Sequence, residues 1–309
     1  AVPVSLLPVP GKARLIALEP EGDAERMAHL AHSRDVVFPA LHGTYGEDGA
    51  IQGLLELSDL PYVGAGITGS AVAMDKAIAK AVLSAGGFPQ LPYLVVLRSQ
   101  WEQKPRLIEE EVEAHLGYPC FVKPASLGSS VGISKVRSSA ELQPALAEAA
   151  IYDRKLVIEK DAGDAREVEC SVLGNDAPIA SVPGEIVPSR EFYDYVAKYH
   201  DSDSQLIIPA RISPEAARRV QELAVQAFRA MDCAGMARVD FFVDKGTEEI
   251  YINEINTIPG FTPISMYPKL WEASGVSYAN LIDRLIELAM ERHKDKQRNV
   301  TSYSPHGKK

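Results

Sequence analysis

The sequence predicts a fold of mixed α/β and α+β type, in which an α/β unit comes first and antiparallel strands lie toward the C-terminus. Three observations lead to this prediction. The continuous apolar run from Asp35 to Pro39 is typical of a strand in a buried parallel sheet. Strand-like and helix-like segments then alternate between residues 93 and 159. Near the C-terminus, two strand-like runs flank the turn Asp244-Lys245-Gly246, as in a β-hairpin.

The composition limits the classes of function. A chain of 309 residues suggests two or three domains, and 46% hydrophobic with 24% charged residues is usual for a globular protein. The net charge of -10 argues against a nucleic-acid partner, which needs a basic surface. A local group of Lys and Arg could still bind the phosphates of ATP inside an acidic protein.

The cysteines and the apolar runs bear on the cellular compartment. Cys120, Cys170 and Cys233 lie far apart without metal-ligand spacing, which predicts buried, reduced thiols. No apolar run reaches about 18 residues, so we expect no membrane span. The first ten residues lack a basic region and contain three prolines, which argues against a signal peptide. The expected location is the cytoplasm.

The first third of the chain predicts half of an open α/β domain. The prolines among the first ten residues favour irregular structure or an edge strand, and Arg14 to Leu18 could form a short strand. After the strand at residues 35–39 comes the loop LHGTYGEDG. A helix over Ala50 to Leu57 and a short strand over Pro61 to Gly64 follow, which completes a β-loop-α-β pattern.

The middle third predicts a long helix and then an alternation of strands and helices. The Ala-rich segment 70–85 has helical periodicity with Ser70 as the N-cap, and Gly86-Gly87 ends it. The expected strands are 93–97, 120–124, 131–136 and 156–159, and the expected helices are 107–116 and 139–150.

The last third predicts antiparallel strands and two helices. Residues 165–187 predict two strands around the turn Gly174-Asn175-Asp176. The polar and aromatic segment 188–208 is long enough to indicate a functional loop. The remaining expected elements are a helix over Pro214 to Met231 capped by Ser213, strands over 237–243 and 249–255, a helix over 278–293 and a disordered tail.

The predicted C-terminal hairpin carries the strongest chemical signal. Arg238 and Asp240 are two residues apart on one strand, and Glu254 and Asn256 are two apart on the other. Residues i and i+2 share a face of a strand, so pairing would bring these side chains to one patch. Two carboxylates and an amide oxygen are ligands that suit Mg2+. The alternative is a solvated salt-bridge face, which the apolar residues between them disfavour.

The segment FVKPASLGSSVG offers a second site, because a strand delivers Lys123 to a loop of small residues. Backbone N–H groups in such a loop can bind an anion, and the lysine adds a positive charge. It is not a Walker loop, since the Gly-Lys-Ser/Thr ending and the following helix are absent. Taken alone, such a loop is more often a plain turn.

Other charged residues indicate a binding site only in combination with the segments near them. Lys76 lies early in the Ala-rich helix and could be a solvated side chain or could face the Lys123 loop. Glu159 and Lys160 end a strand, and Glu167 follows shortly after. Such a strand end could hold an adenine and a ribose hydroxyl, or could simply be a charged terminus.

Taken together, the ordered motifs LHGTYGEDG, AMDK, FVKPASLGSSVG, LVIEK, FYDYVAKY, MARVD and INEINTIPGFTPIS resemble the D-alanine–D-alanine ligase family. They run through residues 36–266 in family order, and the similarity extends to about residue 293. The resemblance implies an ATP-grasp fold preceded by a partial Rossmann-like (pre-ATP-grasp) domain. The implied division is residues 1–74, 75–162 for the central subdomain, and 163–309 for the C-terminal subdomain with the metal site and a lid loop.

The resemblance also implies roles at the nucleotide. Lys76 and Lys123 would contact the phosphates of ATP, and Lys198, on the lid, would reach the γ-phosphate. Glu159, Lys160 and Glu167 would hold the adenine and ribose. Two Mg2+ ions, with Mn2+ as an alternative, would be bound by Asp240, Glu254 and Asn256.

A second group of residues would serve the amino-acid substrates. His42 would lie near the first D-alanine, and Ser265 and Met266 near the carboxylate of the second. Arg238 and the backbone N–H of Gly260 would form an oxyanion hole. The remaining residues implied at the site close over the substrates or link to them: Tyr193, Tyr199 and Ser129.

The implied reaction joins two D-alanine molecules for peptidoglycan precursor synthesis. The first carboxylate attacks the γ-phosphate to give an acyl phosphate, and the amine of the second D-alanine then expels phosphate. A lid is needed because water would hydrolyse the acyl phosphate. In this family a tyrosine at the position of Tyr199 goes with an amine acceptor, so the expected product is a dipeptide. The expected assembly is a homodimer.

The sequence departs from the family at its start. Members begin with a βαβ unit whose Gly-rich segment is followed by Glu-His, and this Glu links to Ser129 and Tyr199. No such segment precedes residue 35, so the expectation is a chain that lacks this unit. Two alternatives to an active ligase follow: a truncated, catalytically impaired ATP-binding fragment, or an ATP-grasp ligase with another acyl acceptor.

Overall fold

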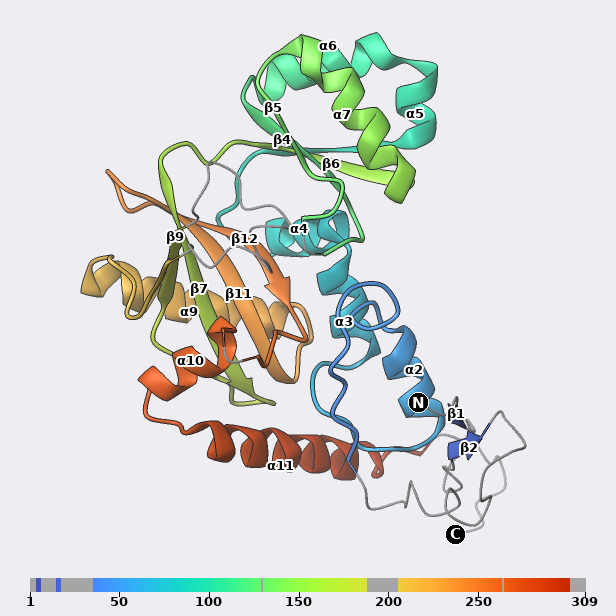
Figure 1. The fold of residues 1–309 in the computed structure, drawn as a ribbon, viewed down its shortest axis with the longest axis vertical. Coiled ribbons are helices and arrows are strands. Elements are labelled where there is room, and N and C mark those ends of the chain that lie inside the picture. The colour runs from blue at the N-terminus through green and yellow to red at the C-terminus, as the bar shows by residue number, and fades with distance from the viewer. Residues whose placement is uncertain are drawn as a thin grey trace.

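The computed structural model describes residues 4–6, 15–17, 36–128, 130–187, 205–262 and 264–300. A small N-terminal unit is followed by a four-stranded and a six-stranded sheet, both antiparallel (Figure 1). The predicted combination of α/β and α+β architecture is therefore confirmed. Within the described ranges, no helix has the length and apolar character needed to cross a membrane.

The N-terminal unit contains the predicted β-loop-α-β pattern. The Val37 N–H donates to the Pro61 carbonyl and the Val63 N–H donates to the Val37 carbonyl, both at 2.9 Å, so the two segments run parallel. Helix α2 (Ala50–Leu57) connects them, with the bounds predicted from the sequence. The first two strands, which pair antiparallel, are β1 (Val4–Leu6) and β2 (Leu15–Ala17).

The four-stranded sheet has the order β3-β6-β4-β5. Its strands are β3 (Tyr93–Leu97), β4 (Cys120–Pro124), β5 (Ser134–Val136) and β6 (Lys155–Lys160). Its helices are α5 (Arg98–Gln103), α6 (Pro105–His115) and α7 (Ser139–Tyr152). Apolar side chains of α6 and α7, such as Val112 and Leu142, pack with Val122 and Ile158 of the sheet in one core.

The six-stranded sheet has the order β10-β9-β7-β11-β12, with β8 beside β7. Its strands are β7 (Ala165–Gly174), β8 (Ile179–Ala180), β9 (Gly184–Val187), β10 (Gln205–Ile207), β11 (Gly235–Asp244) and β12 (Ile250–Asn256). Helix α9 (Pro214–Ala230) packs on it, and Ser213 caps that helix as predicted, accepting from the Ala216 N–H. Ala237, Val239 and Phe241 of β11 are buried in the same core.

The predicted single helix over residues 70–85 is wrong. The structure has two helices, α3 (Ile67–Met74) and α4 (Lys76–Ala85), and Ser70 lies inside the first instead of capping it. Asp75 separates them because its backbone is extended, at φ -83° and ψ 98°. Its side chain accepts hydrogen bonds from the Ala77 and Ile78 N–H groups, which makes it the N-cap of α4.

Two other boundaries differ from the sequence predictions. Strand β5 begins at Ser134 rather than Val131, because Ser130 and Gly132 have φ values of 58° and 68°, which belong to turns. The strand expected after the turn at residues 174–176 is divided into β8 and β9. Helices α5 and α10 (Met266–Ala273) were not predicted at all.

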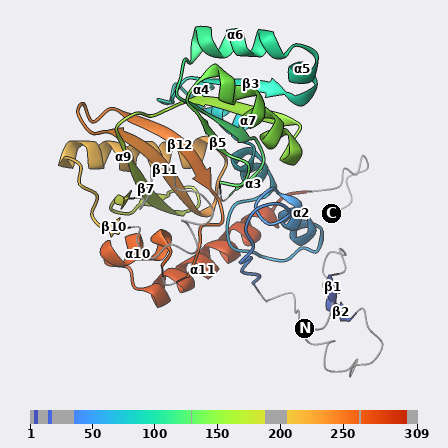
Figure 2. The ribbon, with the colours of Figure 1, turned by 45° about the horizontal axis from the view of Figure 1, so that its top comes forward.

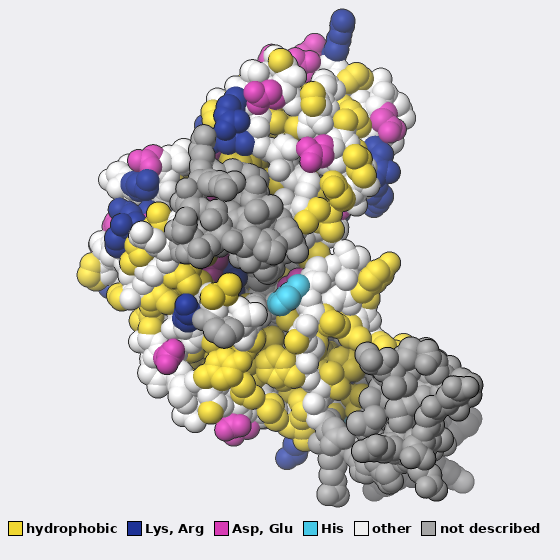
Figure 3. Space-filling model, viewed as in Figure 1, with side chains coloured by type: hydrophobic (Ala, Val, Ile, Leu, Met, Phe, Trp, Pro, Cys, Tyr) yellow, Lys and Arg dark blue, Asp and Glu magenta, His cyan; other side chains and the backbone are white. Residues whose placement is uncertain are grey.

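The last helix, α11 (Tyr278–Lys296), connects the C-terminal part of the fold to the N-terminal unit. In both views it starts beside α10, runs along one edge of the molecule and ends near α2 (Figures 1 and 2). The Phe261 ring also reaches the N-terminal unit, with its centroid 5.3 Å from that of Phe38. On the face drawn in Figure 3, hydrophobic side chains gather over α10 and α11, whereas Lys and Arg are interspersed with Asp and Glu.

Candidate active site

A pocket of about 600 Å3 lies between the two sheets. One wall comes from β4, β6 and the loop after β4, and the other from β7, β9, β11 and β12. Six of the residues predicted at a nucleotide or metal site line it: Lys76, Lys123, Glu159, Lys160, Glu167 and Glu254. The apolar part of the lining, which sequence reasoning missed, includes Phe121, Ile133, Ile186 and Phe242.

The register of β11 and β12 brings the predicted charged residues together. Asp240 lies opposite Glu254, and Arg238 lies opposite Asn256. A shift in the register after Asp240 leaves one extra residue on β12, so that Ile252 and Ile255 both reach the core although they are three residues apart. The prediction that the hairpin gathers these side chains is therefore confirmed.

Arg238 is the centre of this cluster. Its Nε and Nη2 atoms donate to the two carboxylate oxygens of Asp240 at 2.7 and 2.6 Å, and Nε lies 3.1 Å from Glu169 Oε2. Burial disfavours the charged guanidinium, but Asp240 and Glu169 outweigh it and hold the pKa of Arg238 well above its ordinary value. The side chain therefore stays cationic at the base of the site.

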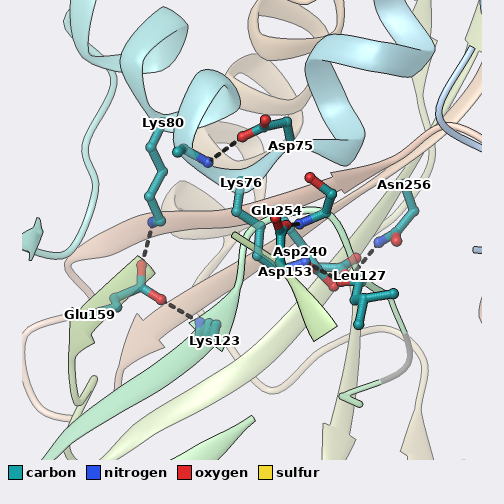
Figure 4. Close-up of polar contacts among 12 residues, drawn as sticks. Asp75, Lys76, Lys80, Lys123, Leu127, Asp153, Glu159, Asp240, Glu254 and Asn256 are labelled. Atoms are coloured by element: carbon teal, nitrogen blue, oxygen red, sulfur yellow. Dashed lines mark hydrogen bonds and ion pairs between the residues drawn. The ribbon is translucent and has the colours of Figure 1, made fainter. Parts of the chain in front are cut away.

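The donor set fits Mg2+. Asn256 Nδ2 donates to Asp240 Oδ2 at 2.9 Å, and Glu254 lies opposite Asp240 on β12, so one amide and two carboxylates share this part of the hairpin (Figure 4). Mg2+ is commonly bound through one or two carboxylates together with substrate phosphates and water. In the described part of the chain, no cluster of three or more His, Cys, Asp and Glu side chains is arranged for a metal ion.

Helix α4 brings Lys76 to the pocket. Its Nζ donates to the Leu127 carbonyl at 2.6 Å and lies 3.6 Å from Glu254 Oε2 (Figure 4). Its backbone N–H donates to the Ala125 carbonyl at 2.8 Å. Lys76 therefore lies between the small-residue loop after β4 and Glu254 of β12, and its side chain faces the pocket and not the solvent.

Glu159 is buried at the pocket wall between two lysines. One carboxylate oxygen pairs with Lys80 of α4 and the other with Lys123 of β4 (Figure 4). Burial raises the pKa of Glu159, but Lys123 and Lys80 outweigh it and lower the pKa below its ordinary value. Lys80 was not singled out in the sequence, because one lysine in an Ala-rich helix is usually solvated.

Comparisons with known proteins decide the family. The family model described as "D-ala D-ala ligase C-terminus" matches residues 82–287, and "D-ala D-ala ligase N-terminus" matches residues 16–65.

The chain belongs to the D-alanine–D-alanine ligase family.

Two curated relatives illustrate the extent of the match. The D-alanine–D-alanine ligase of Heliobacterium modesticaldum is 58% identical over 88% of this chain and 74% of its own length. That of Geobacillus thermodenitrificans is 50% identical over 96% of this chain and 78% of its own length. The chain thus spans about three quarters of the length of these D-alanine–D-alanine ligases.

Two solved structures share the fold. The D-alanine–D-alanine ligase from Coxiella burnetii is 43% identical with a TM-score of 0.76, covering 93% of this chain and 78% of that one. A D-Ala:D-Ser ligase from Enterococcus faecalis is 37% identical with a TM-score of 0.79, covering 93% and 79%. The ATP-grasp fold predicted from the family resemblance is confirmed.

In this member of the D-alanine–D-alanine ligase family, the loop after the first parallel strand places Glu47 near the cluster. Its Oε2 accepts a hydrogen bond from the Gly43 N–H at 2.6 Å. Burial raises the pKa of Glu47, and its charge interacts with His42, Glu254 and Arg238. Glu47, which belongs to the motif LHGTYGEDG and was not predicted as a site residue, therefore lies near the cluster together with the predicted residue His42.

The segment before α10 holds the other predicted substrate residues. The Ser265 hydroxyl accepts from the Thr262 N–H at 3.0 Å, and a Cβ added at Gly260 would lie 2.6 Å from it. The Met266 side chain is buried with Ile186. At this position only the backbone of Met266 can meet a substrate. Four predicted residues lie outside the described ranges: Ser129, Tyr193, Lys198 and Tyr199.

Proposed function

We propose that this chain joins two D-alanine molecules into D-alanyl-D-alanine, using ATP and an acyl-phosphate intermediate, for peptidoglycan precursor synthesis. The observation that supports it best is the pocket between the sheets, which Lys76, Lys123 and Glu254 all line, with Lys76 Nζ 3.6 Å from Glu254 Oε2. Curated relatives with the D-alanine–D-alanine ligase name, at 50 to 58% identity, support the choice of substrate.

The nucleotide would occupy the pocket. Lys76 and Lys123 would neutralise its phosphates, and the N–H groups of the loop after β4 would add dipoles. Lys160 and Glu167 line the pocket and would contact the ribose or the adenine. The apolar side chains of Phe121 and Phe242 would pack against the adenine ring. The Glu159 carboxylate is already paired with two lysines, so its contribution would be to hold Lys123.

Asp240, Glu254 and Asn256 would hold two Mg2+ ions, or Mn2+. When bound, the ions would neutralise charge on the phosphates, which is the main requirement of phosphoryl transfer. Lys76 lies beside Glu254 and would place the phosphates against this cluster. Lys198 would add a further cation at the γ-phosphate.

The two chemical steps are those that the family resemblance implies, and Arg238 would serve the second of them. The carboxylate of the first D-alanine attacks the γ-phosphorus, ADP leaves, and an acyl phosphate results. The amine of the second D-alanine then attacks the carbonyl carbon, and inorganic phosphate leaves with the former carboxylate oxygen. Arg238 and the Gly260 N–H would donate to the oxyanion of the tetrahedral intermediate. Asp240 and Glu169 keep Arg238 charged, so it would remain cationic during the second step.

The remaining assignments concern how the substrates are held. His42 would lie beside the first D-alanine, with Glu47 behind it. Ser265 and the backbone of Met266 would meet the second carboxylate at the start of α10, where a helix N-terminus favours an anion. Tyr193, Tyr199 and Ser129 would close the site against water. The proposal includes a homodimer, which sedimentation of the purified chain would test.

The test is ADP release with Mg-ATP and D-alanine, together with identification of the product by mass. L-Alanine, D-lactate and D-serine serve as alternative substrates, the last because of the similarity to a D-Ala:D-Ser ligase. Turnover with D-alanine alone would support the proposal. Preferred use of D-serine or D-lactate as acceptor would overturn it. Binding of ATP without turnover would instead indicate the impaired nucleotide-binding fragment.

A further inference from the structure

Lys80 is a buried cation that none of the proposed chemical steps uses. Its residue is 2% exposed, and its Nζ pairs with Glu159 Oε1 on the side of α4 that faces β6 (Figure 4). Removing an ammonium group from water costs several kcal/mol unless it is well paired. A leucine at this helix position would avoid that cost, so the lysine needs an explanation beyond packing.

The explanation lies in the two ion pairs of Glu159, one at each of its carboxylate oxygens. Oε1 pairs with Lys80 and Oε2 pairs with Lys123, whose Nζ faces the nucleotide pocket. Lys123 and Glu159 line the pocket, whereas Lys80 is absent from its lining. Two cations and one anion give this buried group a net charge of +1. Without Lys80 the charges of Lys123 and Glu159 would cancel.

Two sets of contacts fix the position of Lys80. One attaches the first turn of α4 to the sheet, and the other places the Lys80 ammonium group beside an aromatic ring. The Asp75 cap pairs with Lys155 of β6, and the Lys76 N–H donates to the Ala125 carbonyl, so the first turn of α4 is attached to β4 and β6. Beside Glu159, the Lys80 ammonium lies 5.3 Å from the centre of the Tyr93 ring. These contacts hold the Lys80 side chain in one orientation toward Glu159.

We propose that Lys80 is a positioning residue for nucleotide binding: it neutralises Glu159 from the side away from the pocket, so that Lys123 offers an uncompensated positive charge to a phosphate of ATP. The inference rests on the proposed function and adds to it a residue that does not touch the substrate. Consistent with it, the pKa of Glu159 is lowered despite burial, so the carboxylate is ionised and requires this compensation.

The experiment compares four variants by the dissociation constant of Mg-ADP, measured by titration calorimetry, with circular dichroism to confirm folding. Lys80→Met removes the compensating charge and is expected to weaken ADP binding about tenfold. Lys80→Arg keeps the charge and is expected to stay within threefold of the original chain. Lys80→Met combined with Glu159→Gln returns the group to +1 and is expected to recover most of the lost affinity. Lys296→Met, which removes a lysine that pairs with Glu56 outside this pocket, is the control and is expected to change affinity less than twofold.

Recovery in the double variant distinguishes charge from packing. If Lys80 only filled space, the double variant would bind ADP no better than Lys80→Met, and that result would overturn the proposal, as would unchanged affinity in Lys80→Met. Should Lys80→Met fail to fold, loss of ADP affinity in a folded double variant or in Lys80→Arg would also overturn it. The readout needs no turnover, so a chain that binds ADP but does not ligate D-alanine would refute the proposed function and leave this test intact.

Discussion

Gly260 shows how one missing side chain can shape the site. A Cβ at this position would lie 2.6 Å from Ser265 Oγ, closer than real Cβ atoms approach their neighbours. Gly260→Ala should therefore displace the Ser265 hydroxyl and move the Gly260 N–H from the oxyanion. We expect kcat for dipeptide formation to fall about 100-fold, the usual effect of losing one oxyanion donor. Steady-state kinetics with D-alanine would measure it.

The control for this substitution is Gly53→Ala inside α2. A Cβ there would meet only the Ile67 side chain at 3.9 Å, so the change fits without displacement. It should leave kcat unchanged and, by the ordinary helix preference for alanine, stabilise the fold slightly. An equal loss of kcat in both variants would contradict the role given to Gly260.

At the residue scale, contacts that follow a repeating local pattern could be predicted from the sequence, whereas long-range contacts could not. Alternation along two strands predicted that Arg238 and Asp240 meet Glu254 and Asn256, and the register confirms it. Lys80 could not be found this way, because its partner Glu159 lies 79 positions away. Nothing local distinguishes a buried lysine in a helix from a solvated one.

At the scale of elements, helix ends depended on single residues. The capping residue Ser213 and the following proline predicted the start of α9 correctly, because a hydroxyl before an N1 proline is a local signal. Residues 70–85 contain one such local signal, the N-cap residue Asp75, but the alanines on both sides of it favour a continuous helix. The extended backbone of Asp75 is stabilised by its pairing with Lys155, a contact from another element.

Ion pairs that join strands at the rim of the pocket lead to a second prediction. Glu185 of β9 is buried and accepts from Arg166 of β7 at 3.0 Å and from Arg211, after β10, at 2.7 and 2.9 Å. Burial opposes its charge, but the two arginines outweigh it and lower the pKa of Glu185 from 4.5 to about 2. A lowered folded-state pKa contributes stability that is present above pH 4.5 and is lost as the pH falls toward 2.

Glu185→Gln should therefore be less stable than the original chain at pH 7, by about 2 kcal/mol once the exposure of Arg211 is considered. The difference should shrink as the pH falls from 5 and vanish near pH 2. Urea unfolding across this range would measure it. Glu222→Gln removes an exposed carboxylate paired with Arg219 at 3.3 Å and should change stability by less than about 0.5 kcal/mol. A pH-independent difference for Glu185→Gln would show that the ion pairs are not its cause.

At the scale of the whole molecule, the sequence predicted the class of fold and the order of its parts, but not how the parts are joined. The division at residues 74 and 162 remains a prediction. The pocket depends on two sheets that no local pattern relates to each other. Helix α4 and the loop after it join the two sheets. Ala79 and Leu83 of α4 pack in the core of the six-stranded sheet, Lys76 lies beside Glu254, and the Ile252 N–H donates to the Pro89 carbonyl at 2.9 Å. Contacts between residues so far apart in the sequence leave no local pattern from which they could be predicted.

The attachment of α11 to the N-terminal unit gives the last prediction. Arg292 donates to the carbonyls of Tyr62 and Gly64, and its guanidinium lies 4.3 Å from the centre of the Tyr62 ring. Arg292→Met would leave these part-buried carbonyls without their donor, at a cost of about 1–3 kcal/mol. Because the same unit carries His42 and Glu47, we expect faster hydrogen exchange over residues 36–66 and a KM for D-alanine raised several-fold. The dissociation constant of ADP should not change, since its pocket lies between the sheets.

Arg284→Met, which removes exposed ion pairs to Glu287 and Glu291 on the same helix, should affect none of these quantities. Equal weakening of ADP and D-alanine binding by Arg292→Met would mean that α11 supports the whole fold and has no separate role in positioning the N-terminal unit.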